Sequence, residues 1–244
     1  MSAKTATTTA SAKEIAHFQS MADDWWSGTG HFKPLHLLNQ PRLAFIRDTL
    51  LAHFARDGNA PQPFAGLSLL DVGCGGGLLC EPLARMGFRV TGIDAGEKGI
   101  ETARRHARQS ELDIDYRCAT PEMLDQTFDV VTSMEVIEHV SDPAAFLGAI
   151  ARCLVPGGAF LGATLNRTPQ SLALAVIGAE YVLRWVPRGT HDWRKFIRPS
   201  EFAQLLRRSG ITVRAFEGIS YRPWRDAWER STTLDINYNV YAIR

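Results

Sequence analysis

The sequence is poor in cysteine and has no excess of either charge, and both properties exclude classes of protein. Its four cysteines are Cys74, Cys80, Cys118 and Cys153, and none of them forms a C-x-x-C pair. This spacing indicates buried thiols in a reducing cytosol rather than a disulfide framework or a zinc site. Lys and Arg number 27 against 26 Asp and Glu, so the net charge is +1. Nucleic-acid binders usually carry a basic excess or a basic stripe, and we therefore expect no nucleic-acid partner.

Long apolar runs and internal repeats are also missing. No run is long and apolar enough to span a bilayer, so we predict no transmembrane helix and a cytoplasmic protein. Residues 1–13 are polar and lack both the apolar core of a signal peptide and the arginines of a transit peptide. We predict a disordered tail over these residues.

Residues 14–244 are expected to form one α/β domain, because short apolar runs alternate with helical patterns along the chain. Strands are predicted at 67–73, 89–94, 114–119, 128–134, 157–165, 211–221 and 236–244. The pattern predicts a doubly wound, mostly parallel, seven-stranded sheet whose last two strands form a hairpin at its edge. The expected parts are N-terminal helices (14–66), a cofactor-binding core (67–165), a helical insertion (166–199) and a C-terminal helix with strands (200–244).

A glycine-rich loop follows the first predicted strand. The stretch LLDVGCGGGLL places Gly73, Gly75 and Gly77 in a turn that opens the next helix. Glycines allow such a turn and let a ligand approach the backbone N–H groups at the helix start. Asp94 ends the second strand about twenty residues later, where a carboxylate accepts hydrogen bonds from ribose hydroxyls. We interpret these residues as a site for a nucleotide-like cofactor.

The charge beside this loop favours a cationic cofactor. A dinucleotide site prefers G-x-G-x-x-G, but the last position here is Leu78. Asp71 stands immediately before the loop, where its charge repels a pyrophosphate and attracts a cation. S-adenosylmethionine carries a sulfonium and an ammonium group and no phosphate, so the pattern favours it. A tight turn without a ligand is the alternative, and the combination of Asp71, the glycines and Asp94 argues against it.

At these residues the chain resembles the class I S-adenosylmethionine-dependent methyltransferases, a Rossmann-like fold. The stretches that carry the resemblance are LDVGCGGG, VTGID, FDVVTSMEVIEHVSDP and LVPGG. Other stretches resemble the ubiquinone-biosynthesis O-methyltransferases: WWSGTGHFKPLHLLNQPRLAFI, TLNRT, GAEYVLRWVPRGTHDWRKFI and NYNVY. This resemblance implies methylation of phenol and catechol hydroxyls on polyprenylated quinone precursors, namely 2-polyprenyl-6-hydroxyphenol and 3-demethylubiquinol. It also suggests a biosynthetic complex with other quinone-pathway enzymes.

The resemblance also implies the residues that bind the cofactor. They would be Arg42, Gly73, Asp94 and Met134, to which the loop itself adds Asp71 and Gly75. Arg42 would clamp the cofactor's carboxylate with two hydrogen bonds, although a solvated helix residue is its simpler interpretation. Met134 would pack near the adenosine or the sulfonium. Two other functions stay open: a methyltransferase for another small phenolic acceptor, or an inactive cofactor-binding scaffold.

The stretch SMEVIEHV follows the fourth predicted strand and carries Glu135, Glu138 and His139. One helical turn would bring the three side chains to one face, where they suit a divalent cation. The resemblance implies metal dependence through this motif, and a metal would lower the pKa of a phenol from about 10. We favour Mg²⁺, with Zn²⁺ or Mn²⁺ as alternatives. The rival interpretation is metal-free: His139 acts as a general base. His139 and Glu135 are the predicted catalytic residues.

The predicted insertion is too long for a bare loop and has an amphipathic composition. Its apolar residues are Leu172, Leu174, Ala175, Ile177, Tyr181, Val182 and Trp185, and its basic residues are Arg167, Arg184, Arg188, Arg194 and Lys195. Packing on the domain is the ordinary fate of such a helix. Our hypothesis is a lid that also contacts anionic lipid through 167–189, at the inner face of the bacterial plasma membrane.

Other aromatic and polar residues are candidates for the acceptor pocket. His191 and Asp192 would line it, although a helix cap is the simpler interpretation of Asp192. Four further side chains would cover an aromatic acceptor or simply pack in the core: Trp25, Trp26, Phe32 and His36.

Overall fold

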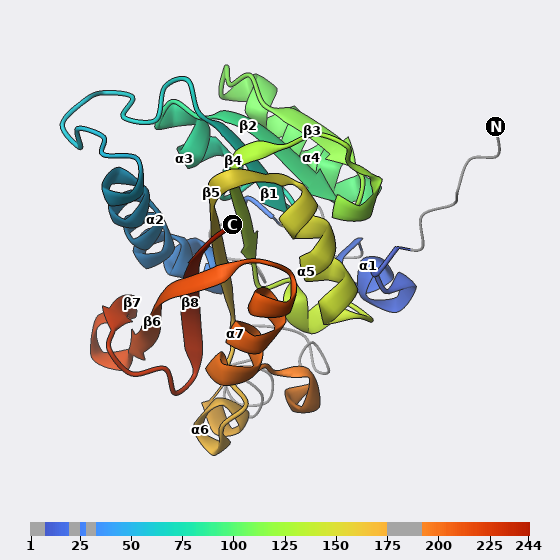
Figure 1. The fold of residues 1–244 in the computed structure, drawn as a ribbon, viewed down its shortest axis with the longest axis vertical. Helices are drawn as coiled ribbons and strands as arrows, with labels where there is room; N and C mark the ends of the chain where they lie inside the picture. The colour runs from blue at the N-terminus through green and yellow to red at the C-terminus, as the bar shows by residue number, and fades with distance from the viewer. Residues whose placement is uncertain (1–7, 20–24, 28–32, 175–191) are drawn as a thin grey trace.

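One mixed sheet forms the centre of the molecule (Figure 1). The structure is a computed structural model that describes residues 8–19, 25–27, 33–174 and 192–244. Its strands follow the order β3-β2-β1-β4-β5-β8-β6-β7. Their bounds are β1 Ser68–Val72, β2 Arg89–Asp94, β3 Asp115–Cys118, β4 Phe128–Met134, β5 Leu154–Leu165, β6 Thr212–Arg222, β7 Ala227–Ser231 and β8 Asn237–Ile243.

Helices connect these strands, as the alternating pattern predicts. The α-helices are α1 Ala12–Gln19, α2 Lys33–His53, α3 Cys80–Arg85, α4 Glu97–Gln109, α5 Pro143–Arg152, α6 Pro169–Ser171 and α7 Pro199–Arg208. Short 3₁₀ helices are η2 Pro121–Met123, η3 Ile137–His139, η5 Trp193–Lys195 and η6 Pro223–Arg225. Among the described residues, no helix is long and apolar enough to cross a membrane.

The sheet is parallel in its first five strands and antiparallel in the rest. β1 pairs in parallel with β2 and β4, and β5 joins β4 in parallel. β8 lies antiparallel between β5 and β6. The α/β class and the pairing of the last two predicted strands are therefore confirmed. An eighth strand, β7, occupies the edge position expected for that pair. Its sequence AWERS is only partly buried and mixes polar with apolar residues, so it carries no clear strand pattern.

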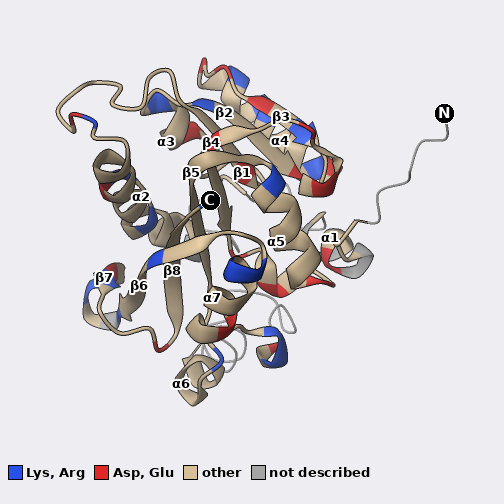
Figure 2. Cartoon of the chain, viewed as in Figure 1, with Lys and Arg blue, Asp and Glu red and all other residues tan. Residues whose placement is uncertain are grey.

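Both faces of the sheet are covered, because successive strand residues point to opposite sides. On one face, Leu70 and Val131 pack with apolar side chains of α5 and α7. On the other face, Leu69 and Val130 pack with side chains of α2, α3 and α4. Figure 2 shows Lys, Arg, Asp and Glu mainly on helices and outer loops, while the central strands are largely uncharged. This doubly wound arrangement places the exits of β1, β2 and β4 at one edge, where open α/β folds bind ligands.

The segment before α1 packs against the turn after β4. Ala10 forms an antiparallel bridge with Val140, and the Ser141 N–H donates to the Thr9 carbonyl at 2.9 Å. The Thr9 hydroxyl donates to Glu122 Oε1 at 2.6 Å. Thr9 and Ala10, which belong to the predicted tail, thus have defined partners in the domain. They precede α1, whose Glu14 lies at the exit of β4.

Candidate active site

The glycine loop lies against the turn that follows β4. Gly73 and Gly75 adopt positive φ angles of +75° and +51°, a region that favours glycine. A Cβ atom on Gly73 would lie 2.4 Å from the nearest methyl carbon of Val136. Val136 is the residue between Glu135 and η3, so the tertiary structure joins the two motifs that the sequence separates by about sixty positions.

Asp94 is tied to the glycine loop by hydrogen bonds. The Gly75 N–H donates to its Oδ2 at 3.0 Å, and the Gly96 N–H donates to its Oδ1 at 2.7 Å. Desolvation raises the pKa of Asp94, against the opposing effect of these two bonds. A carboxylate has about four acceptor positions, so two bonds leave capacity for ribose hydroxyls.

Asp71 lies beneath the same loop and is almost fully buried. Its carboxylate accepts a hydrogen bond from the Thr132 hydroxyl at 2.7 Å and from the Cys80 thiol at 3.3 Å. Burial raises its pKa to about 6, and these two bonds only partly offset the effect. A nearby cation would favour the charged form, so the site suits a positively charged ligand.

Arg42 reaches the exit of β4, but its partner there is a protein carboxylate. Its Nη2 forms an ion pair with Glu135 Oε1, and the Asn237 amide donates to the same oxygen at 2.7 Å. Glu135 itself has a positive φ of +57°, a strained backbone conformation for a non-glycine residue. Among the described residues, the buried Arg42 Nε has no hydrogen-bond partner. Arg42 therefore keeps a donor that a bound carboxylate would satisfy.

Two polar residues follow β4: Glu138, which is buried, and His139, which is half-buried. Thr164 donates to Glu138 Oε2 at 3.0 Å, while Oε1 has no partner among the described residues. Burial, reinforced by the charge of Glu135, raises the pKa of Glu138 to about 7. His139 Nδ1 lies 3.1 Å from Glu14 Oε2. Burial alone would lower the pKa of His139, but the bond to Glu14 and the surrounding carboxylates raise it.

The metal site predicted at Glu135, Glu138 and His139 does not fit this arrangement. Within the part of the chain that the structure describes, no three His, Cys, Asp or Glu side chains form a group that could hold a metal ion. Each of the three residues has a partner elsewhere in the protein, although for Glu138 this holds for one oxygen only. Glu135 holds Arg42 and Asn237, Glu138 accepts from a threonine hydroxyl, and His139 contacts the carboxylate of α1. The turn brings Glu138 and His139 to the lining of one hollow, and Glu135 is not among the described residues that line it.

Two tryptophans pack on the glycine loop. Trp26 Nε1 donates to the Gly76 carbonyl at 2.9 Å, and its ring stacks on His106 with centroids 3.4 Å apart. A Cβ on Gly75 would lie 2.4 Å from the Trp25 ring. His36 lies 2.9 Å from the Trp25 carbonyl. These residues therefore cover the glycine loop itself. Phe32 lies outside the described residues.

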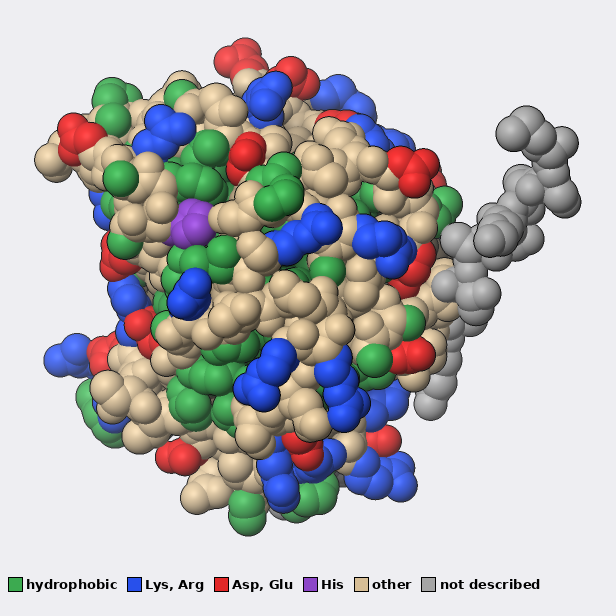
Figure 3. Space-filling model, in the orientation of Figure 1, with side chains coloured by type: hydrophobic (Ala, Val, Ile, Leu, Met, Phe, Trp, Pro, Cys, Tyr) green, Lys and Arg blue, Asp and Glu red, His purple; other side chains and the backbone are tan. Residues whose placement is uncertain are grey.

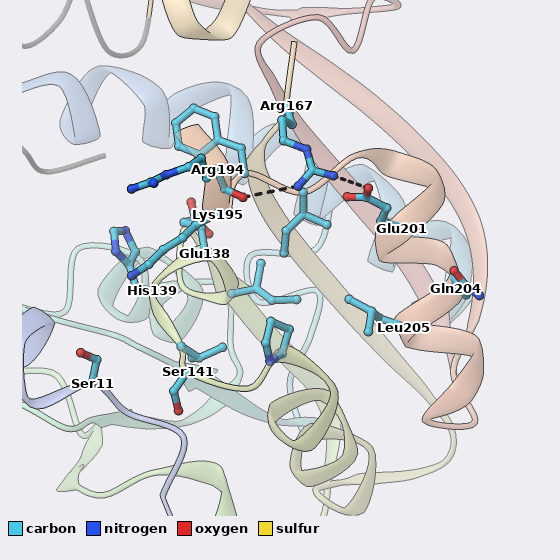
Figure 4. Close-up of a pocket in the computed structure, with 15 residues that line it drawn as sticks. Ser11, Glu138, His139, Ser141, Arg167, Arg194, Lys195, Glu201, Gln204 and Leu205 are labelled. Atoms are coloured by element: carbon cyan, nitrogen blue, oxygen red, sulfur yellow. Dashed lines mark hydrogen bonds and ion pairs between the residues drawn. The ribbon is translucent and has the colours of Figure 1, made fainter. Parts of the chain in front are cut away.

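A hollow of about 580 Å³ opens next to Glu138 and His139, between η3, η5 and α7 (Figure 4). Arg167 crosses its rim to pair with Glu201 and to donate to the Arg194 carbonyl. Figure 3 shows Lys and Arg side chains gathered over α7 and the segment before it. The hollow thus combines a basic rim with apolar walls, which are Ile137, Val140, Pro143, Phe196, Ile197 and Leu205.

Some predicted acceptor residues have other roles or lie outside the described residues. Asp192 caps η5 by accepting from the Arg194 N–H at 3.1 Å, so the simpler interpretation of Asp192 is confirmed. His191 and residues 175–190 of the predicted insertion are not among the described residues.

Sequence reasoning missed three partners of the site: Glu14, Thr164 and Asn237. Each reaches the β4 turn from a distant element. No spacing within the sequence signals these contacts.

Known proteins match this chain over nearly its whole length. Residues 41–215 match a protein family described as a methyltransferase domain. A ubiquinone biosynthesis O-methyltransferase from Paramagnetospirillum magneticum is 58% identical over 238 residues, covering 97% of this chain and 96% of that protein. One from Caulobacter vibrioides is 55% identical over 229 residues, covering 92% of this chain and 91% of that protein.

Solved structures share the fold at lower identity. Magnesium protoporphyrin IX methyltransferase from Synechocystis PCC 6803, solved with bound SAH, aligns with a TM-score of 0.65 and 20% identity. The alignment covers 95% of this chain and 99% of that chain, and it supports the fold alone.

Proposed function

The chain belongs to the ubiquinone biosynthesis O-methyltransferases, and on that premise we propose that its acceptor is a hydroxyl of a polyprenylated phenol or catechol. The observation that carries the proposal is the contact between Gly73 and Val136. In support of the proposal, it joins a loop that suits a cationic nucleotide-like ligand to the turn that leads to His139. Proximity and alignment supply much of the rate enhancement of such a transfer.

The residues around the glycine loop fit S-adenosylmethionine. When bound, this cofactor supplies an electrophilic methyl carbon on a sulfonium. Gly73 and Gly75 let it approach the backbone, Asp94 accepts from its ribose, and the charge of Asp71 complements its cationic groups. The unpartnered Arg42 Nε receives its carboxylate. Met134, at the end of β4, would pack beside it.

His139 is the proposed general base. A phenol has a pKa of about 10, so its proton must be removed for its oxygen to attack at neutral pH. The contact between His139 Nδ1 and Glu14 favours the tautomer in which Nε2 is the acceptor. Glu135, also predicted as catalytic, holds Arg42 and Asn237 and so shapes the cofactor side. The proposed reaction uses no metal ion, because the predicted ligands Glu135, Glu138 and His139 do not form a group that could hold one.

The basic rim of the hollow supports a second part of the proposal. A polyprenyl acceptor resides in lipid, and cationic side chains near an apolar surface attract anionic headgroups. We propose that residues 167–189 contact anionic lipid, which would place the enzyme at the inner face of the plasma membrane. A liposome flotation assay tests this: no binding to vesicles of anionic lipid, above binding to neutral vesicles, contradicts it.

One turnover assay tests acceptor, base and metal together. The enzyme is incubated with S-adenosylmethionine and a prenylated catechol, with and without chelator, beside a His139→Gln variant. We expect turnover that survives the chelator and falls at least 100-fold in the variant. A rate that collapses on chelation and returns with Mg²⁺, Mn²⁺ or Zn²⁺ contradicts the metal-free base.

The same assay separates the alternative functions. Turnover of a non-prenylated phenol alone would indicate a different small acceptor. Absent turnover combined with calorimetric binding of S-adenosylhomocysteine would indicate an inactive scaffold.

A further inference from the structure

Glu14 joins three elements that are remote in the sequence. Its Oε2 lies 3.1 Å from His139 Nδ1 in η3, and its Oε1 accepts from Lys195 Nζ in η5 at 3.2 Å. The two partners are 125 and 181 positions away. One carboxylate of α1 therefore contacts both the β4 exit and the segment that follows residues 175–191.

The surroundings of Glu14 make this contact well defined. The side chains of Glu14 and His139 are only 21% and 15% exposed. The hydrogen bond from His139 lowers the pKa of Glu14 to about 2, although partial burial opposes the shift. Glu14 is therefore ionised across the working pH range and acts only as an acceptor. Lys195 donates to Glu14 Oε1 while His139 contacts Oε2, so two partners fix the orientation of the carboxylate. Figure 4 shows His139 and Lys195 next to each other.

We propose that Glu14 is a positioning residue for His139. By accepting from Nδ1–H, it fixes the tautomer in which Nε2 receives the acceptor's proton, and its charge stabilises the imidazolium that results. A buried carboxylate orients a catalytic imidazole in this way in serine hydrolases. The proposal rests on the proposed function, because it requires His139 to be the base.

The proton and electrons in this step balance. The phenol O–H bond breaks, and its proton passes to His139 Nε2. The electron pair left on the oxygen forms the new bond to the methyl carbon, while the methyl–sulfur pair returns to sulfur. Glu14 gains no proton, which agrees with its low pKa.

A Glu14→Gln variant tests the positioning role. A glutamine keeps the shape but lacks the charge, and its NH₂ group favours the wrong imidazole tautomer. We expect kcat to fall by about 10-fold or more, because the group that fixes the tautomer of the imidazole is lost. The KM for a prenylated catechol and the Kd for S-adenosylhomocysteine should stay within about twofold. Glu14→Asp, which restores the charge, should recover part of kcat and serves if the glutamine variant folds poorly.

The matched control is Glu122→Gln. Glu122 anchors the same N-terminal segment, because its carboxylate accepts from the Thr9 hydroxyl, whereas Glu14 contacts His139. A merely structural loss of this segment would affect both variants, whereas the positioning role predicts a wild-type kcat for Glu122→Gln. ¹⁵N NMR of the histidines, with His139 assigned from the His139→Gln spectrum, should show Nδ1 protonated in the wild type and a changed pattern only in Glu14→Gln.

The outcomes separate this proposal from the proposed function. If His139→Gln is inactive but Glu14→Gln keeps kcat within twofold, or if both Glu→Gln variants lose kcat equally, the positioning role is overturned and the base stands. If His139→Gln retains wild-type turnover, His139 is not the general base, and the positioning role of Glu14 is overturned as well.

Discussion

At the scale of single residues, the site depends on glycines and carboxylates whose surroundings leave little freedom. Gly75 is confined by its φ of +51° and by Trp25, which lies where a Cβ would be. Asp71 is confined by burial and by two donors. The sequence shows that these positions hold a glycine and an aspartate. Only the structure shows the neighbours from other segments that constrain them, which are Trp25 for Gly75 and Thr132 and Cys80 for Asp71.

A Gly75→Ala substitution should weaken cofactor binding more than it destabilises the fold. The new methyl group would lie 2.4 Å from the Trp25 ring, so the ring or the loop must shift. Gly157→Ala is the control, because Gly157 has a φ of +78° and no atom near its Cβ position. We expect both variants to lose about 1–2 kcal/mol in urea unfolding. Only Gly75→Ala should raise the Kd for S-adenosylhomocysteine, by about tenfold or more; equal Kd values for the two variants would contradict this role of Trp25.

Asp71 should make the folded protein less stable as the pH rises from about 4 to 6. Its pKa is about 6 in the folded state and 3.8 in its unperturbed state. The folded state therefore binds more protons in this window, and the free energy of unfolding falls as the pH increases. The contribution is about 3 kcal/mol at most, from about two pKa units of roughly 1.4 kcal/mol each. Urea unfolding at several pH values checks this: Asp71→Asn should show a flatter dependence, and a slope equal to that of the wild type refutes the assignment.

At the scale of elements, the start of α5 holds the turn that carries His139. Asp142 Oδ1 accepts from the Ala144 and Ala145 N–H groups, each at 3.0 Å. Pro143 occupies the first helical position, where its missing N–H has no cost. The cap and the proline thus begin α5 three and four residues after His139, the last residue of η3.

Asp142→Ala should remove this cap and cost about 1 kcal/mol of stability. Asp142→Asn is the matched control, because an asparagine side chain caps a helix about as well. Thermal unfolding of both variants checks the expectation. A loss in the asparagine variant as large as that in the alanine variant would show that the charge, and not the cap, matters.

At the scale of the whole molecule, one continuous sheet connects every described segment that builds the site. α2 supplies Arg42, β4 leads to Glu135, and β8 supplies Asn237. Because β4 and β8 belong to one sheet and α2 packs in one of the two apolar layers that cover it, the parts predicted over residues 14–244 should not unfold separately.

Calorimetric or denaturant unfolding should therefore show one cooperative transition. S-adenosylhomocysteine at about 100 times its Kd should increase the free energy of unfolding by about 2.7 kcal/mol. The Gly75→Ala variant, at the same ligand concentration, should gain less. Two separate transitions, of which only one shifts with ligand, would contradict a single domain.

The sequence by itself determined the α/β class, the position of most strands and the glycine loop. These features are local: strand runs, helix boundaries and turn glycines are encoded within a few residues of one another. The strand over Phe128–Met134 and the helix that begins at Pro199 agree with their patterns. β7 was missed because an edge strand of mixed polarity has no such pattern.

Only the tertiary structure decided what the side chains after β4 contact. Spacing in the sequence predicts that Glu135, Glu138 and His139 share a face, but it says nothing about partners from other elements. Arg42 forms an ion pair with Glu135, and Glu14 contacts the imidazole of His139. A charged side chain near a folded core pairs with the nearest opposite charge, and the nearest one is set by the packing of elements far apart in the chain. For this reason the sequence predicts the glycine loop and the polar turn after β4, while the fold determines which distant side chains contact them.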